Sequence, residues 1–149
     1  MEQLSLFKQD EAKRYVLISL KPEYFEWMLN GYKKYEYRSR FPDCKTFTFI
    51  YVTKPVGAIQ ACIEFDKPIK EHHALIGCTG QGVEDFIAGR KGSKMAIPIV
   101  HIHLLNDPVD LNTMRNYGIT APQSYCYLKP GDPFLEFLKN RVGDDMDWK

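Results

Sequence analysis

The chain has 149 residues, with 20 basic and 19 acidic side chains and a formal net charge of +1. This length suits one domain with a single core, and 44% hydrophobic residues exclude an intrinsically disordered chain. No apolar run approaches the roughly 20 residues that a membrane-spanning helix needs. The first residues lack the basic start and long apolar stretch of a signal peptide, so we expect a cytoplasmic protein.

The predicted elements begin after residues 1–12, which we expect to form a flexible arm. Residues 15–20 form a continuous apolar run, which is typical of a buried strand. Pro22 then suits the first turn of a helix, and Gly31 suits its left-handed end. A strand that carries several charged residues and ends at Arg38 is expected next.

The rest of the chain predicts a mixture of strands and short helices. Alternating apolar residues at 46–52 and 58–65 predict two antiparallel strands. The elements expected after them are a helix at 83–88, a strand at 95–105 that Pro98 confines to an edge or a bulge, a helix at 111–117, a strand at 124–128 and a helix at 133–140. Residues 143–149 are expected to be a frayed tail. Residues 13–142 thus predict one α+β domain, a small mixed barrel of five or six strands with short flanking helices.

Basic side chains are concentrated in the first third of the chain. From Lys13 to Lys54 there are 9 basic and 4 acidic residues, whereas the remainder holds 11 basic and 15 acidic residues. A nearly neutral protein can still present one basic face, and such a face attracts polyanions. The alternative is a charged surface without a binding role.

Lys33, Lys34, Glu36 and Arg38 are the leading candidates for a functional site. On an extended strand, Lys34, Glu36 and Arg38 share one face and Lys33 lies on the other. Lys21, at the end of the first strand, is expected to point into the same space. Cations around one carboxylate suit a phosphate group, with the carboxylate fixing their geometry or acting as a base. We therefore predict a pocket for nucleic acid or a nucleotide; the alternative is a polar strand edge without function.

Several aromatic side chains near these cations are suited to stacking on bases, and we expect one or two of them to be available: Tyr24, Trp27, Tyr32, Tyr35 and Tyr37. The glycine-rich segments at 77–82 and 89–94 lack the Gly-Lys-Ser/Thr ending of a P-loop. His101 and His103 share one face of a predicted strand, but no third ligand is evident. We therefore expect neither a metal nor another cofactor.

Two motifs in the first third resemble the signature of the ASCH domain, a family in the PUA-like superfamily of small RNA-associated barrels. They are Ile18-Ser19-Leu20-Lys21-Pro22-Glu23-Tyr24 and Gly31-x-Lys33-x-x-Glu36-x-Arg38. Segments 50–55 and 121–125 also resemble parts of such domains. The resemblance implies a pseudobarrel with a basic cleft beside the first helix. It implies that the cleft is lined by Lys21, Lys33, Glu36 and Arg38, joined by Lys34, Tyr51, Lys54 and Ser124.

The resemblance implies more than one activity. ASCH domains are associated with RNA binding, with cleavage of single-stranded RNA and with hydrolysis of the acetylcytidine amide. The amidohydrolase branch has a threonine nucleophile three residues after its lysine, and this chain has Glu36 there. Binding of RNA or a nucleotide is the leading hypothesis. The alternative is a metal-independent ribonuclease or modified-nucleoside hydrolase in which Lys33 and Glu36 are catalytic.

A short motif near the N-terminus predicts a third kind of function. Gln3-Leu4-Ser5-Leu6-Phe7 matches the pentapeptide with which bacterial replication and repair proteins dock on the sliding clamp. Such motifs work because a flexible arm delivers hydrophobic side chains into an apolar pocket. The predicted clamp contacts are Gln3, Leu4, Leu6 and Phe7. The alternative is that the hydrophobic residues pack back on the domain and the match is accidental.

Overall fold

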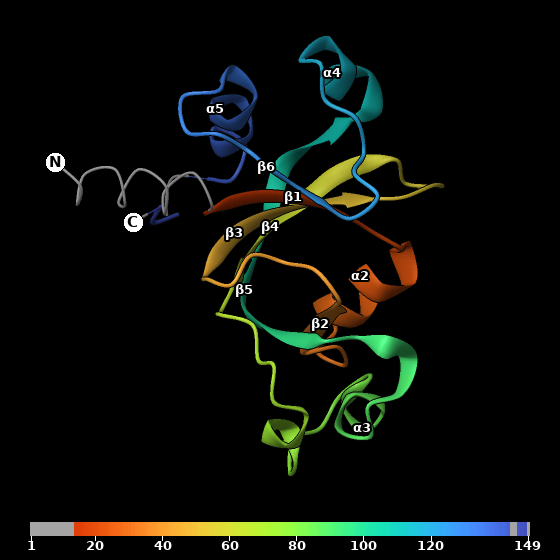
Figure 1. The fold of residues 1–149 in the computed structure, drawn as a ribbon. Coiled ribbons are helices and arrows are strands. Elements are labelled where there is room, and N and C mark those ends of the chain that lie inside the picture. Colours follow the sequence, from red (N-terminus) through yellow and green to blue (C-terminus); the bar gives the residue numbers. More distant parts are fainter. Residues whose placement is uncertain (1–13, 144–145, 149) are drawn as a thin grey trace, which may run out of the picture.

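The computed structural model of the protein describes residues 14–143 and 146–148, which form one curled sheet with short helices around it (Figure 1). The helices and strands are β1 (Tyr15–Leu20), α2 (Pro22–Leu29), β2 (Tyr35–Arg38), β3 (Thr46–Val52), β4 (Ala58–Phe65), α3 (Val83–Ile87), β5 (Met95–Asp110), α4 (Leu111–Asn116), β6 (Tyr125–Tyr127) and α5 (Pro133–Lys139). Two 3-10 helices, His72–Leu75 and Arg90–Gly92, lie before and after α3 in the chain.

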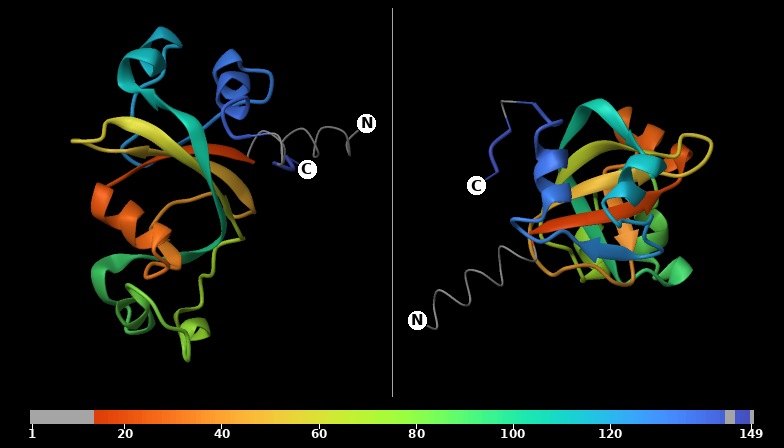
Figure 2. Two further views of the ribbon diagram at one scale, coloured as in Figure 1. Left: turned by 180° about the vertical axis from the view of Figure 1, so that it is seen from behind. Right: turned by 90° about the horizontal axis from the view of Figure 1, so that it is seen from above.

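The six strands form one sheet in the order β2-β5-β4-β3-β1-β6. β1 and β3 pair in parallel, and the other neighbouring pairs of this sheet are antiparallel. Figure 2 shows that the sheet curls instead of lying flat, with α4 and α5 at one end and α2 and α3 at the other. The predicted α+β barrel with short helices is therefore confirmed, with six strands.

The alternation predicted for residues 46–52 divides the core into two parts. Phe47 and Phe49 of β3 pack in one cluster with residues of α4 and α5, while Ile50 and Val52 pack in a second cluster with residues of α2. Every residue of β3 is buried. A strand that is covered on both faces anchors the sheet, because each large apolar side chain contributes about 1.5–3 kcal/mol on full burial.

β5 continues five residues beyond the predicted end at residue 105, to Asp110. Its first residues pair with β2 and its later residues with β4. Between these parts, Phe65 pairs with Ile99 and Glu64 with His101, so Val100 is an extra residue on β5. Of the two alternatives predicted for Pro98, β5 is not an edge strand, and its bulge lies two residues after Pro98. The segment Asn106-Asp107-Pro108, which is typical of a turn, continues the strand instead.

Part of the expected frayed tail packs on the core. Met146 is buried, and the ring of Trp148 lies 5.1 Å from that of Phe47 and 6.2 Å from that of Phe49. These contacts are made with residues about a hundred positions earlier in the chain. The pattern of the last seven residues alone therefore does not predict them.

The expected N-terminal arm at residues 1–12, with the clamp motif at 3–7, lies outside the described residues. Docking on the sliding clamp therefore stays a prediction.

Within the described part of the chain, no helix is both long enough and apolar enough to cross a membrane.

Candidate functional site

A tight turn after α2 sets the position of Lys33. Gly31 has a φ of +83°, the left-handed conformation predicted for the helix end. The backbone N–H of Lys33 then donates to the carbonyl oxygen of Trp27 over 2.9 Å. The chain becomes extended only at Tyr35. The prediction that Lys33 lies on the opposite face of a strand from Glu36 is therefore wrong, because the strand has not yet begun at Lys33.

Lys33, Glu36 and Arg38 form a network of ion pairs, which we call the seam cluster. Lys33 Nζ lies 3.2 Å from Glu36 Oε1, and Arg38 Nε donates to Glu36 Oε2 over 2.7 Å. Lys33 and Glu36 are only 4% and 5% exposed. The predicted grouping of these two cations around one carboxylate is what the structure shows.

Arg38 joins opposite ends of the sheet. Its Nη1 donates to the carbonyl oxygen of Ser124 over 2.9 Å, and its Nη2 donates to the carbonyl oxygen of Ser19 over 3.0 Å. Ser19 belongs to β1 and Ser124 directly precedes β6, whereas Arg38 ends β2, the strand at the other end of the strand order. The guanidinium thus closes the curled sheet along a seam. Its side chain is 16% exposed, so the cluster reaches solvent there.

The seam cluster holds two cations for one carboxylate. Both ion-pair partners of Glu36 are cations, and the only acid paired with Lys33 or Arg38 in the described chain is Glu36. Burial lowers the pKa of Lys33, and the attraction and hydrogen bond from Glu36 oppose this shift, while the Arg38 guanidinium lowers it further. With Lys33 and Arg38 both protonated, the cluster carries one excess positive charge in a poorly hydrated place.

Aromatic rings enclose the Lys33 ammonium on two sides. Lys33 Nζ lies 4.7 Å from the ring centroid of Tyr37 and 5.5 Å from that of Tyr24. Lys21, which is exposed, places its Nζ 6.0 Å from the same Tyr24 ring. Such cation–π contacts stabilise a buried ammonium. Lys21 therefore lies at the rim of the seam cluster, one aromatic ring away from Lys33.

The other four predicted site residues have different surroundings. Lys34 is exposed and donates to Thr79 Oγ1 over 3.3 Å, and Lys54 is exposed in the turn after β3. Tyr51 is buried in the core cluster that holds Phe49. Ser124 contacts Arg38 through its carbonyl oxygen and not through its hydroxyl. A binding role for these four residues stays a prediction.

Gln81 is a cluster residue that the sequence analysis missed. Its Oε1 accepts from Lys33 Nζ over 3.0 Å, its carbonyl oxygen accepts from the Tyr37 hydroxyl over 2.7 Å, and its N–H donates to the Tyr32 carbonyl over 2.8 Å. The glycines on either side make this approach feasible. A Cβ on Gly80 would lie 3.0 Å from the Tyr32 carbonyl oxygen, and one on Gly82 would lie 2.5 Å from the Tyr37 ring. In the sequence, the glycines on both sides of Gln81 are the feature that could have indicated close packing at this loop.

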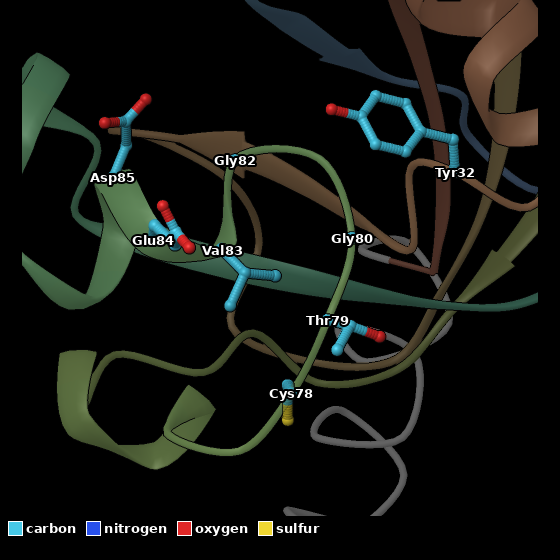
Figure 3. Close-up of a pocket in the computed structure, with 8 residues that line it drawn as sticks. All are labelled: Tyr32, Cys78, Thr79, Gly80, Gly82, Val83, Glu84 and Asp85. Atoms are coloured by element: carbon cyan, nitrogen blue, oxygen red, sulfur yellow. The ribbon is translucent and has the colours of Figure 1, made fainter.

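A hollow of about 380 Å³ adjoins the loop that carries Gln81 (Figure 3). Tyr32 stands on one side of it, and the carboxylates of Glu84 and Asp85 stand on the other. The remaining lining residues are Cys78, Thr79, Gly80, Gly82 and Val83. The hollow therefore has an aromatic ring on one side and carboxylates on the other. Tyr32, which lines it, directly precedes Lys33 of the seam cluster in the chain.

His101 and His103 do not belong to the seam cluster. His103 Nε2 lies 2.7 Å from Glu64 Oε2, and the two histidine rings lie 4.3 Å apart. Across residues 14–143 and 146–148, no three histidine, cysteine or acidic side chains gather closely enough to hold a metal ion.

Sequence comparison alone does not place this chain. No protein-family model matches it, and no curated protein sequence matches it. Its fold, however, matches the crystal structure of ASCH from Zymomonas mobilis with a TM-score of 0.68 and 18% identity, over 89% of this chain and 98% of that chain. This chain has an ASCH fold.

Two variants of the same Zymomonas mobilis protein give the same result for the fold. One, with a serine replaced by alanine, matches with a TM-score of 0.68 over 87% of this chain. The other, with a tyrosine replaced by phenylalanine, matches with a TM-score of 0.67 over the same share. The ASCH resemblance of the two sequence motifs is therefore confirmed at the level of the fold, and the PUA-like barrel that it implied is present.

Proposed function

We propose that this ASCH-fold protein binds RNA or a nucleotide at the rim of the seam cluster, with a phosphate beside Arg38 and Lys21. The observation that supports this most is the charge of the cluster: two cations share one buried carboxylate. A charge in a poorly hydrated place is costly unless it is paired. A phosphate at the exposed edge offsets the excess positive charge.

Arg38 has the donors that such a contact needs. A guanidinium carries five N–H groups, and its hydrogen bonds to Glu36, Ser19 and Ser124 use three of them. The remaining two are available where the side chain reaches solvent. Lys21 follows Ser19 by two residues and is exposed, so its ammonium can turn toward the same phosphate. Lys33 is only 4% exposed, so in this binding mode it acts through its charge and Arg38 makes the direct contact.

Binding of labelled single-stranded RNA at several salt concentrations tests the proposal. Phosphate contacts release counterions, so the logarithm of the affinity should fall linearly with the logarithm of the salt concentration. Lys21→Ala should weaken binding to every sequence and reduce that slope by about 1. Lys129→Ala, which removes an exposed lysine between β6 and α5, is the matched control. Absence of RNA or nucleotide binding at low salt would reject the proposal.

A second candidate function is catalysis, as a metal-independent ribonuclease or modified-nucleoside hydrolase. The lowered pKa of Lys33 favours it, because a lysine that loses its proton more readily can act as a base. Glu36, 3.2 Å away, would hold the lysine in place. Labelled RNA should then be cleaved in the presence of a chelator by the wild type and not by a folded Lys33→Met variant. Intact RNA in both reactions would reject the ribonuclease.

A further inference from the structure

Aromatic rings on one side of α2 and in the turn after it form a row that leads away from the seam cluster. The ring centroids of Tyr24 and Trp27 lie 5.5 Å apart, and those of Trp27 and Tyr32 also lie 5.5 Å apart. Lys21 stands at the first end of this row, over Tyr24. Tyr32 stands at the other end and lines the hollow of Figure 3. We call Tyr24, Trp27 and Tyr32 the aromatic row.

The aromatic row is not the face that α2 uses to pack against the sheet. Phe25 and Met28 are the buried residues of the helix and belong to its core cluster, against which Tyr24 also packs with part of its surface. Tyr24 and Trp27 are only partly buried, and Tyr32 is 52% exposed. Proteins that bind single-stranded nucleic acid typically combine solvent-exposed aromatic rings with nearby cations.

The backbone around Tyr32 is held in place although the ring is exposed. Its N–H donates to Asn30 Oδ1 over 3.0 Å, and its carbonyl oxygen accepts from the N–H of Gln81 over 2.8 Å. The ring also meets Trp27 edge to face, at an interplanar angle of 89°. A ring that is already oriented loses little conformational freedom when a ligand stacks on it.

We propose that the aromatic row is a stacking platform for the unpaired bases of single-stranded RNA. This inference rests on the proposed function and specifies which side chains contact the bases. Adjacent rings are tilted by 58° and 89°, so bases that stack on Trp27 and on Tyr32 meet differently oriented rings, while Lys21 and Lys33 lie over the ring of Tyr24. Bases within a duplex are stacked on each other and do not offer their faces. The platform therefore favours single strands over duplexes.

Charge determines how the strand lies. The phosphate is attracted to the end of the row at Lys21 and the seam cluster. At the other end, Glu84 and Asp85 line the hollow, and the Glu84 carboxylate, which has no ion-pair partner among the described residues, repels a phosphate. Asp85 is already paired with Arg90 and Lys91, which leaves the exposed Glu84 to accept from an N–H group on the edge of a base. The last base of the bound segment accordingly sits at Tyr32 with its edge toward the hollow.

Tryptophan fluorescence follows the proposed contact directly. The chain contains 2 tryptophans, so a Trp148→Phe variant leaves Trp27 as its only reporter. Titration of this variant with a single-stranded oligouridine should quench Trp27, whereas a blunt RNA hairpin of equal length should bind at least about tenfold more weakly, because only unpaired bases stack. Equal binding of the hairpin would overturn the platform.

A pair of substitutions at Tyr32 separates stacking from other effects. Tyr32→Leu should weaken binding of the oligouridine by about 5- to 150-fold, the range expected for loss of one stacked base. Tyr32→Phe keeps the ring and should bind like the wild type. Tyr117→Leu, at an exposed tyrosine that caps α4, is the control for loss of a surface ring. Thermal unfolding of each variant shows that it is folded.

These measurements distinguish failure of the platform from failure of the proposed function. If Lys21→Ala weakens RNA binding but Tyr32→Leu does not, the phosphate site stands and the platform is rejected. If the wild type binds neither oligouridine nor hairpin at low salt, both proposals are rejected.

Discussion

Two carboxylates in this protein each lie between two cations, and they differ in burial. Glu36 pairs with Lys33 and Arg38 inside the seam cluster. Asp85, in α3, pairs with Arg90 over 2.9 Å and with Lys91 over 3.2 Å, and these two cations are 65% and 75% exposed. Each group consists of two cations and one carboxylate, so the two groups have the same formal net charge. Water screens the second group, while the first retains its excess charge in a poorly hydrated place.

The comparison shows why a count of charges is a poor guide to a site. Exposed ion pairs are worth roughly 0–1 kcal/mol because solvent competes with them. In the buried group, loss of one partner leaves an unpaired charge, which is far more costly. The same arrangement of side chains therefore marks a candidate anion site at the seam and an ordinary surface contact at α3.

The largest expected effect is that of Glu36→Gln. This substitution leaves the buried Lys33 and the partly buried Arg38 without their carboxylate, so the free energy of unfolding should fall by about 3–5 kcal/mol. Chemical denaturation at neutral pH measures it. Glu26→Gln, at an exposed glutamate of α2, should change stability by less than about 0.5 kcal/mol. Similar small effects of both substitutions would contradict the difference between buried and exposed carboxylates.

Arg38→Lys should have an intermediate effect. The charge is kept, but a lysine has no planar fork with which to reach Glu36, Ser19 and Ser124 at once. Loss of the two hydrogen bonds that close the seam should lower the free energy of unfolding by about 1–3 kcal/mol. Hydrogen exchange should also increase in β2 and β6. Unchanged protection of these strands would show that Arg38 does not close the sheet.

The lowered pKa of Lys33 predicts a pH dependence with a definite sign. Between the folded pKa and the ordinary lysine pKa of 10.5, the unfolded chain binds more protons at Lys33 than the folded chain does. Stability relative to a Lys33→Met variant should therefore rise as the pH increases through this window, by at most about 1.4 kcal/mol per pH unit. Denaturation of both proteins from pH 7 to pH 10 measures the difference. A falling difference would mean that the pKa is raised.

The smallest expected effect is that of Asp85→Asn. Because its cations are exposed, the free energy of unfolding should change by less than about 1 kcal/mol. The change should shrink further in high salt, which screens exposed pairs. The same denaturation experiment at two salt concentrations provides the measurement. A loss as large as that of Glu36→Gln would remove the distinction between the two groups.

Local patterns were sufficient for most elements of the fold. The apolar run at 15–20, the alternation at 46–52 and the helix between Pro22 and Gly31 are found as predicted. Each depends on periodicity or on the backbone preferences of single residues, and these properties act over a few neighbours. The charged residues of the seam cluster could also be named in advance, because they are close together in the sequence.

The structure of the turn at Lys33 and contacts between distant segments decided the rest. The side of the chain on which Lys33 lies follows from its backbone hydrogen bond to Trp27 in the preceding helix. The role of Gln81 depends on a loop that meets Lys33 from 48 positions away. The closure of the sheet depends on Arg38 reaching a carbonyl oxygen 86 residues later. Sequence patterns report short-range preferences, whereas burial and the pairing of charges arise only when the folded chain brings remote residues together.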